Sequence, residues 1–237
     1  MTTGSGIRPL RPRRPWQVVP GVPLASFYTF AVLLIRTLLR VLCRPEVVGL
    51  ERVPREGRLI VVSNHTHFLD PTLIGATLPR KVLFMAKQEL FDDGVIGWMV
   101  RHYDAFPVRR GEADRQALRE AQRALDLGLA VGMFPEGTRS RTGVMREAFA
   151  GAAMIALRGR APILPVGIDG SDRIFPALRS LGRARVRVVY GEPFTIDVDD
   201  RAPDRLVRAT EQMMRRVARL VPEWRRGRYR SEETTPA

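Results

Sequence analysis

The sequence has few of the residues from which covalent or metal-bound frameworks are built. Its 237 residues include one cysteine, Cys43, and three histidines. A single cysteine excludes an internal disulfide framework and a metal site made from cysteines. Hydrophobic residues still make up 45% of the chain, which excludes a disordered protein, and the length fits one domain with appendages.

Acidic residues are also in short supply. Lys and Arg number 39 against 25 Asp and Glu, a formal net charge of +14. Such a surplus favours an anionic partner, which is nucleic acid, an anionic membrane surface or a phosphorylated substrate. The arginines at 8–14 and 215–230 lie at the ends of the chain, and aromatic residues are not interleaved with them as base stacking would favour. We therefore expect no nucleic-acid partner.

The main apolar run is too short to cross a bilayer. From Val22 to Ile35 it spans roughly 14 residues, whereas about 20 are needed. Arg36 and Arg40 follow on one helical face, which is typical of a helix lying in the membrane interface. A helix packed on the protein's own core is the alternative. Residues 1–20 carry four arginines among prolines and are expected to form an extended arm.

From about Val47 onwards, short apolar runs alternate with helical patterns. Strands are predicted at 58–63, 81–86, 105–108, 129–134, 162–168 and 184–191, and helices at 71–78, 94–103, 114–128, 147–158 and about 203–221. This alternation predicts an α/β domain with a largely parallel sheet flanked by helices. We expect four parts, which are a basic Pro/Arg-rich arm at 1–20, a membrane-associating helical segment at 21–45, the α/β domain at 46–222 and a polar tail at 223–237.

Two of the three histidines lie one residue apart in the stretch SNHTHFLDP, residues 63–71. The preceding strand brings His65 to its carboxyl end, where ligands and catalytic groups gather in open α/β sheets. Asp70 and Pro71 are expected to open the next helix at its N-cap and first position. On this short loop Asp70 can accept the Nδ1–H of His65, which leaves Nε2 free to take a proton from an alcohol.

Two other interpretations of this stretch stay open. The letters HTH resemble the His-x-His start of binuclear metallohydrolases, but the residues that follow depart from that pattern, and only His102 remains to complete a metal shell. No metal site is therefore expected. Alternatively, both histidines only hydrogen-bond the loop and Asp70 only caps the helix. His67 is expected to play that passive role.

The stretch FPEGTRS, residues 134–140, leaves another predicted strand at the same edge. Gly137 permits a positive φ and a close approach of the backbone to a ligand. Thr138 offers a hydroxyl, and Arg139 offers a planar fork suited to phosphate oxygens. These residue types together indicate an anion-binding turn.

A third stretch, FPVRRG at 106–111, leads from a strand directly into Arg109 and Arg110. Taken together, these stretches resemble the motifs of the glycerolipid acyltransferases, the PlsC-like family of 1-acylglycerol-3-phosphate acyltransferases. NHTHFLD matches their His-x4-Asp motif, AFPVRRG their second motif, FPEGTRS their third and PILPVGI their fourth, in the same order. The resemblance covers roughly residues 45–195.

The resemblance implies an acyl transfer reaction. His65 would be the general base towards a glycerol hydroxyl, and Asp70 would orient it. The hydroxyl would attack the thioester of acyl-CoA or an acyl-carrier protein, so that neither a cofactor, a metal nor a covalent acyl-enzyme is required. The acceptor would be a lysophospholipid, foremost 1-acyl-sn-glycerol-3-phosphate, used for phospholipid biosynthesis at the cytoplasmic face of a membrane.

The resemblance also implies residues that bind the acceptor. Arg110 and Arg139 would hold its phosphate, with Thr138 beside them, and Glu136 and Gly137 would shape the pocket. Glu136 is the unusual member of this set, because a carboxylate repels a phosphate unless it orients another group.

The sequence departs from the family's motifs at two places. Arg109 stands where an acidic or amide residue often precedes the arginine of the second motif. The stretch EAFAGAAMIAL, residues 147–157, lacks the basic residue that many members have there, and the neighbouring Arg146 is a possible substitute. Another lysolipid or a glycolipid therefore stays open as acceptor. A non-catalytic, basic lipid-binding protein is a further alternative.

Overall fold

The computed structural model describes residues 36–92, 94, 97, 106–108, 115–199 and 201–230. The expected arm at 1–20, residues 21–35 of the expected membrane-associating segment and most of the expected helix at 94–103 lie outside these ranges. Arg109 and Arg110 of the second motif lie outside them as well.

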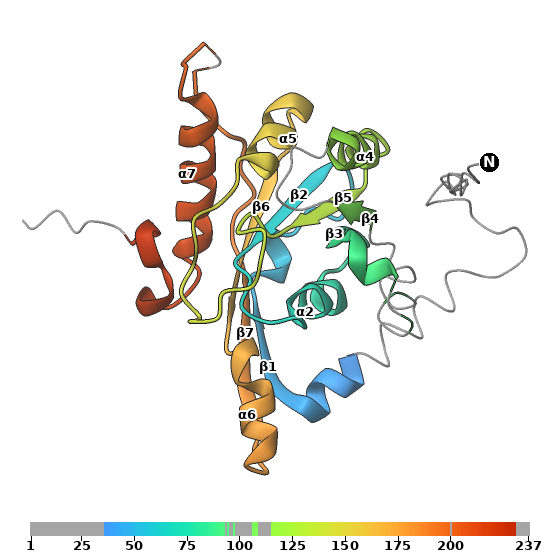
Figure 1. The fold of residues 1–237 in the computed structure, drawn as a ribbon, viewed down its shortest axis with the longest axis vertical. Coiled ribbons are helices and arrows are strands. Elements are labelled where there is room, and N and C mark those ends of the chain that lie inside the picture. Colours follow the sequence, from blue (N-terminus) through green and yellow to red (C-terminus); the bar gives the residue numbers. More distant parts are fainter. Residues whose placement is uncertain are drawn as a thin grey trace, which may run out of the picture.

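A seven-stranded sheet forms the centre of the molecule (Figure 1), in the order β1-β7-β6-β2-β5-β3-β4. Its strands are β1 (Cys43–Val48), β2 (Leu59–Ser63), β3 (Val82–Lys87), β4 (Phe106–Val108), β5 (Ala130–Met133), β6 (Ile163–Asp169) and β7 (Ala184–Tyr190). Neighbours pair in parallel except β6 and β7, which are antiparallel. The expected α/β fold is confirmed, but the sheet is mixed, because β1 and β7 run opposite to the other five strands.

The reversal between β6 and β7 follows from the short connection between them. A parallel crossover usually needs a helix that runs back along the face of the sheet. Here α6 (Ile174–Arg179) has six residues and extends beyond the end of the sheet (Figure 1), so that the chain turns there and returns antiparallel.

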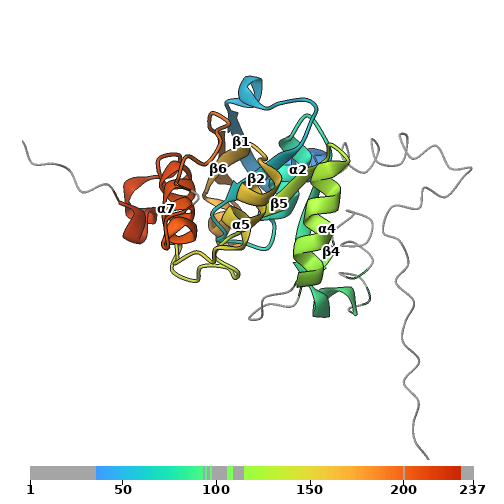
Figure 2. The same cartoon turned by 90° about the horizontal axis from the view of Figure 1, so that it is seen from above.

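Helices cover both faces of the sheet. Among the described residues, the α-helices that flank the sheet are α2 (Asp70–Thr77), α4 (Arg115–Asp126), α5 (Gly151–Gly159), α6 and α7 (Arg205–Ala218). One core cluster packs α4, α5 and α7 against the sheet, and these three helices lie next to one another (Figure 2). The other cluster packs α2 and α6 against the opposite face. Successive residues of β2 alternate between the clusters, since Ile60 belongs to the first and Val61 to the second.

The helical segment before the sheet ends earlier than expected. Residues 36–42 are helical and β1 begins at Cys43, so the helical part of the expected segment at 21–45 ends at residue 42. Within it Leu39 is buried, whereas Leu38 and Val41 are exposed. Within the described ranges, no helix is long and apolar enough to cross a membrane.

The sequence predicts a polar tail from residue 223 onwards, and this prediction is wrong for residues 223–230. Residues 223–230 form two 3-10 turns, η4 (Glu223–Arg225) and η5 (Gly227–Tyr229). Arg225 and Tyr229 are buried, and the Arg225 guanidinium is paired with Asp169 and Asp172. The polar composition of this segment therefore did not predict that it folds. A buried arginine is tolerated where carboxylates neutralise its charge.

Candidate active site

His65 and Asp70 meet at the carboxyl end of β2. The imidazole Nδ1 lies 2.9 Å from Oδ2 of Asp70. The same oxygen accepts the backbone N–H groups of Thr66 and His67, each at 2.7 Å. Three donors on one oxygen fix the short loop between β2 and α2, and with it the orientation of the imidazole.

Asp70 does not act as the N-cap that the sequence suggested. It is the first residue of α2, Leu69 takes the N-cap position, and no side chain caps the helix. The carboxylate turns back towards the preceding loop because it finds the imidazole and two N–H groups there. Pro71 lies in the first turn of α2, as expected.

The imidazole of His65 is almost enclosed. The residue is 7% exposed, and its ring stacks on Phe134 with centroids 4.2 Å apart. Within the described part of the chain, Nδ1 binds Asp70 and no hydrogen bond to Nε2 occurs. In the tautomer that donates Nδ1–H to Asp70, Nε2 carries a lone pair, which suits a general base.

Glu136 holds the backbone of this loop. Its Oε1 accepts the His65 N–H at 3.0 Å, and its Oε2 accepts the Arg146 N–H at 2.8 Å. Burial raises the pKa of its carboxyl to about 7, although these two N–H groups favour the charged form. The His65 carbonyl in turn accepts the Ser140 N–H at 2.7 Å. The turn after β5 therefore binds both the N–H and the carbonyl group of His65.

The remaining residues of the third motif line the outside of this turn. Gly137 has a φ of +68°, and a Cβ there would lie 2.7 Å from Cε2 of Phe149. Thr138 and Arg139 are exposed. The turn thus presents a hydroxyl and a guanidinium to solvent close to His65, whereas Arg110, the other residue expected to hold the phosphate, lies outside the described residues.

Asn64 belongs to the site, although the sequence alone assigned it no role. Its side chain is fully buried, donates to the Ile168 carbonyl at 2.9 Å and accepts the Ile168 N–H at 2.8 Å. These two bonds tie the end of β2 to the end of β6. Nearby, Thr66 Oγ1 and Ser171 Oγ lie 2.9 Å apart. A polar residue directly after a buried strand is the one sequence signal that marks Asn64.

The ring of His67 packs with Phe68 and Phe175. Burial lowers the pKa of its imidazole, and Asp70 opposes that shift while Arg139 adds to it. Across the residues that the structure describes, no group of three or more His, Cys, Asp and Glu side chains is arranged to hold a metal ion.

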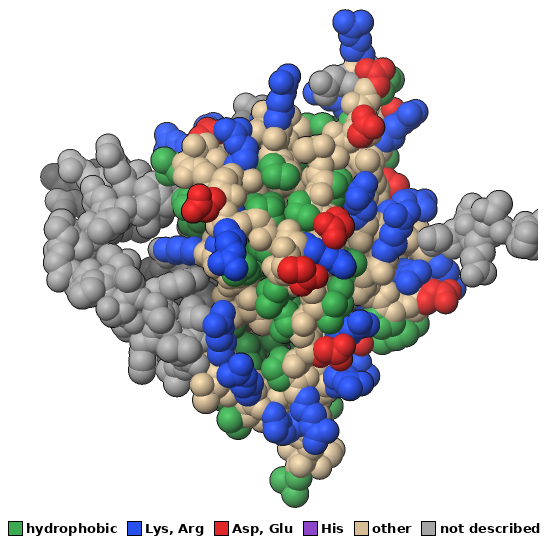
Figure 3. Space-filling view, turned by 180° about the vertical axis from the view of Figure 1, so that it is seen from behind, with side chains coloured by type: hydrophobic (Ala, Val, Ile, Leu, Met, Phe, Trp, Pro, Cys, Tyr) green, Lys and Arg blue, Asp and Glu red, His purple; other side chains and the backbone are tan. Residues whose placement is uncertain are grey.

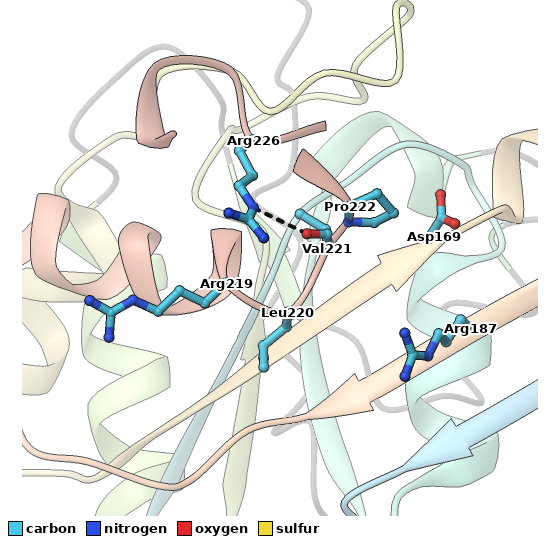
Figure 4. A pocket seen from close by; sticks show the side chains of 7 residues that line it. All are labelled: Asp169, Arg187, Arg219, Leu220, Val221, Pro222 and Arg226. Carbon is cyan, nitrogen blue, oxygen red and sulfur yellow. Dashed lines mark hydrogen bonds between the residues drawn. The ribbon is translucent and has the colours of Figure 1, made fainter. Parts of the chain in front are cut away.

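A pocket lies apart from these residues, between the end of α7 and the strands β6 and β7 (Figure 4). Its lining consists of Asp169, Arg187, Arg219, Leu220, Val221, Pro222 and Arg226. Arg226 donates its Nε–H to the Val221 carbonyl at 3.3 Å, and Arg187 pairs with Glu46 at 3.2 Å. None of the lining residues belongs to the four motifs.

Comparison with known proteins gives a consistent picture. A family model described as Acyltransferase matches residues 44–169, more than half of the chain. The 1-acyl-sn-glycerol-3-phosphate acyltransferase of Bacillus subtilis is 27% identical over 196 residues, which cover 81% of this chain and 96% of that protein. The 1-acyl-sn-glycerol-3-phosphate acyltransferase alpha of Mus musculus is 31% identical over 153 residues, which cover 62% of this chain and 54% of that protein.

The fold is also similar to a solved structure. The crystal structure of the 1-acyl-sn-glycerophosphate (LPA) acyltransferase, PlsC, from Thermotoga maritima matches with a TM-score of 0.61 and 26% sequence identity. The match covers 83% of this chain and 88% of that one. The similarity therefore extends well beyond the four motifs.

Proposed function

The chain belongs to the Acyltransferase family, and on this basis we propose that it moves a fatty acyl group from an acyl thioester to a hydroxyl of a lysophospholipid. The acceptor that we propose is 1-acyl-sn-glycerol-3-phosphate, the compound in the names of its bacterial and mammalian relatives. The observation that carries the proposal is the pair of His65 and Asp70, joined at 2.9 Å.

In this reaction His65 is the general base. Its Nε2 takes the proton of the acceptor hydroxyl while the hydroxyl oxygen attacks the thioester carbonyl. The tetrahedral intermediate then collapses, the C–S bond breaks, and the thiolate receives the proton from Nε2. The products are the acylated lipid and a free thiol. Asp70 holds the imidazole in the required tautomer and stabilises the imidazolium formed in between.

The donor is an acyl-CoA or an acyl-carrier protein, which acts as a co-substrate. The steps above move one proton and exchange a C–S bond for a C–O bond, and the chain's own residues supply the base. We therefore propose the reaction without a metal ion or a resident cofactor.

Thr138 and Arg139 are the proposed contacts for the acceptor's phosphate, together with Arg110. Both described residues are exposed on the turn that also holds Glu136, whose carboxylate is buried and occupied by two N–H groups. These two N–H groups offset part of the repulsion between the charge of Glu136 and an incoming phosphate. A guanidinium supplies two parallel donors to such a group.

The proposed working place is the cytoplasmic face of a membrane, with the protein bound peripherally or monotopically. Leu38 and Val41 are exposed on the segment 36–42, and Leu181 is 99% exposed just after α6. Arg183 joins these two regions through the Cys43 carbonyl at 2.8 Å, and both lie at one end of the molecule (Figure 1). Apolar side chains among basic ones suit an interface with anionic lipids.

A panel of acceptors tests the proposed function. Purified protein is incubated with palmitoyl-CoA and either lysophosphatidic acid, lysophosphatidylcholine, a glycolipid or no acceptor, and the lipid product is identified by mass. We expect phosphatidic acid with lysophosphatidic acid and at least about tenfold less product with the other acceptors, because the phosphate monoester carries more negative charge towards Arg139. Acylation of another acceptor at a higher rate would reassign the substrate, and binding of lipids without acylation of any would support the non-catalytic alternative.

A further inference from the structure

The folded end of the chain is bound to the loop that follows the third motif. We call residues 223–230 the C-terminal segment and residues 141–149 the site loop. The Tyr229 hydroxyl accepts the Ala148 N–H at 3.0 Å, and the Arg225 carbonyl accepts the Met145 N–H at 2.7 Å. The backbone of the site loop is therefore held at two points by one short segment.

Arg225 anchors the C-terminal segment to the sheet. Its side chain is fully buried and pairs with Asp169 at the end of β6 and with Asp172 Oδ1 at 2.7 Å. A further N–H of the same guanidinium donates to the Gly143 carbonyl at 2.9 Å. A buried guanidinium with all of these partners is held rigidly, because leaving its charge unpaired in the interior would be costly. The segment thus links the site loop to the same edge of the sheet that carries His65.

Two glycines show how closely the segment and the loop approach each other. At Gly143, with a φ of +78°, a Cβ would lie 2.7 Å from Nη1 of Arg225. At Gly227, with a φ of +54°, a Cβ would lie 2.5 Å from the Met145 carbonyl oxygen. Both positions combine a left-handed backbone with a contact that any side chain would obstruct. The site loop therefore fits closely against the Arg225 side chain at Gly143, and the segment fits closely against the backbone of the site loop at Gly227.

The site loop connects this contact to the catalytic histidine. Between its two anchored residues, Met145 and Ala148, lies Arg146, whose N–H binds Oε2 of Glu136 at 2.8 Å. The other oxygen of Glu136 binds the His65 N–H at 3.0 Å. We propose that the C-terminal segment is a positioning element of the active site, which keeps His65 in place through the site loop and Glu136.

This role is separate from the chemistry of the proton transfer. Neither Arg225 nor Tyr229 needs to touch a substrate, and each acts through the backbone of the site loop. The catalytic consequence rests on the proposed function, since it presumes that His65 is the base. A misplacement of a catalytic group by about 1 Å can lower a rate by about 100-fold.

The ionisation of Glu136 supplies a readout for this connection. The groups that face its carboxylate are His65, Asp70, Arg146 and Tyr229. The Arg146 N–H lowers the pKa of Glu136, in opposition to burial. Loosening the site loop removes that donor, so the pKa of Glu136 rises. The charged carboxylate accepts the His65 and Arg146 N–H groups more strongly than the neutral acid does, so a higher pKa loosens the loop of His65 at a higher pH and moves the acid limb of a pH–rate profile to higher pH.

The test compares two buried tyrosines. Tyr229→Phe removes the hydroxyl that holds Ala148 and keeps the ring. Tyr190→Phe is the matched control, because Tyr190 is fully buried and its hydroxyl binds Thr77 Oγ1 at 2.6 Å in the other core cluster. Each full-length variant is measured by thermal unfolding, by kcat against pH with palmitoyl-CoA and lysophosphatidic acid, and by hydrogen exchange at individual backbone amides.

We expect both variants to lose similar amounts of thermal stability. Tyr229→Phe alone should lower kcat by about tenfold, move the acid limb to higher pH, and raise the exchange rates of the Arg146 and His65 amides by about tenfold. Equal kcat profiles and equal exchange rates in the two variants would overturn the proposal. If the wild-type protein shows no transfer in this assay, the proposed function fails, while the exchange rates still decide whether the C-terminal segment positions His65.

Discussion

At the scale of single residues, the site is organised around two carboxylates with different tasks. Asp70 directs one oxygen at the imidazole of His65 and at two backbone N–H groups. Glu136 uses both of its oxygens on backbone N–H groups from two different loops. The first orients the base, and the second fixes the loop on which the base stands. Mutation of either residue is expected to lower activity, but for different physical reasons.

Glu136 should make the stability of the protein depend on pH. Burial raises the pKa of its carboxyl from 4.5 to about 7. Between these values the folded protein keeps a proton that the unfolded chain has released. The stability that this proton confers is therefore fully present below about pH 4.5 and is lost as the pH rises through 7.

Glu136→Gln removes the ionisable group and tests this expectation. The free energy of unfolding of the wild type minus that of the variant should fall by on the order of 3 kcal/mol between pH 4.5 and pH 8. Urea unfolding of both proteins at matched pH values measures the difference. A difference that stays constant or increases with pH would show that the carboxylate is not strained by burial.

Gly137 should matter for the acceptor more than for the fold. Both Gly137 and Gly57 have a positive φ, but a Cβ meets the ring of Phe149 at Gly137 and nothing within 4 Å at Gly57. Alanine at either position should cost about 1–2 kcal/mol of stability, because of the backbone conformation. We expect Gly137→Ala alone to raise the KM for the acceptor, by about threefold or more, since Thr138 and Arg139 follow it directly. The prediction fails if the two variants have the same KM.

At the scale of elements, buried apolar runs were the predictable part of the fold. The strands expected at 58–63, 129–134 and 162–168 correspond to β2, β5 and β6, each of which is buried on both faces. The strand β1 was missed because its residues, CRPEVV, include Arg44 and Glu46. These side chains face solvent, where Glu46 pairs with Arg187 of β7. An edge strand with one open face lacks the continuous apolar pattern of the central strands.

The contacts of the site also include some that the sequence predicts and some that it does not. The pairing of His65 with Asp70 was predictable, because only four residues lie between them and the next helix fixes the return of the chain. The backbone contacts of Glu136 were not, since 71 residues separate it from His65. The folded C-terminal segment was also not predictable, because Arg225 is polar by composition and is buried only through carboxylates that lie more than 50 residues away.

Truncation of the N-terminal region tests which element binds the membrane. In segment 36–42, Leu39 packs into the core and its carbonyl accepts the Cys43 thiol at 3.0 Å. A truncation before residue 36 keeps these contacts, whereas a truncation after residue 42 removes them. The shorter truncation is therefore the better test of membrane binding.

Deletion of residues 1–35 should leave the melting temperature nearly unchanged and weaken binding to vesicles. It removes the main apolar run and four arginines, and each basic residue near an anionic surface contributes about 1 kcal/mol. We expect at least a tenfold loss of affinity for phosphatidylglycerol vesicles and little binding of either protein to phosphatidylcholine vesicles. Unchanged affinity in cosedimentation would place the membrane contact on the remaining residues, such as those of segment 36–42 and α6.

At the scale of the whole molecule, the positive charge is widely spread and the chemistry is concentrated. Lys and Arg side chains are distributed over the face shown in Figure 3, with acidic side chains among them. The chain's net charge of +14 thus suits a general attraction to anionic surfaces. By contrast, Asn64, His65, Glu136 and Asp169 come from three strand ends at one edge of the sheet, where β2, β5 and β6 are neighbours. The fold brings distant stretches of chain together at that edge.

The most direct test of the central claim uses the two histidines of one loop. Thiol release from palmitoyl-CoA is measured with and without lysophosphatidic acid for the wild type, His65→Gln and His67→Gln. We predict acceptor-dependent release in the wild type, a loss of about 100- to 10,000-fold in kcat for His65→Gln, and a kcat within about threefold of the wild type for His67→Gln. Near-normal release by a folded His65→Gln protein would contradict the assignment of His65 as the general base.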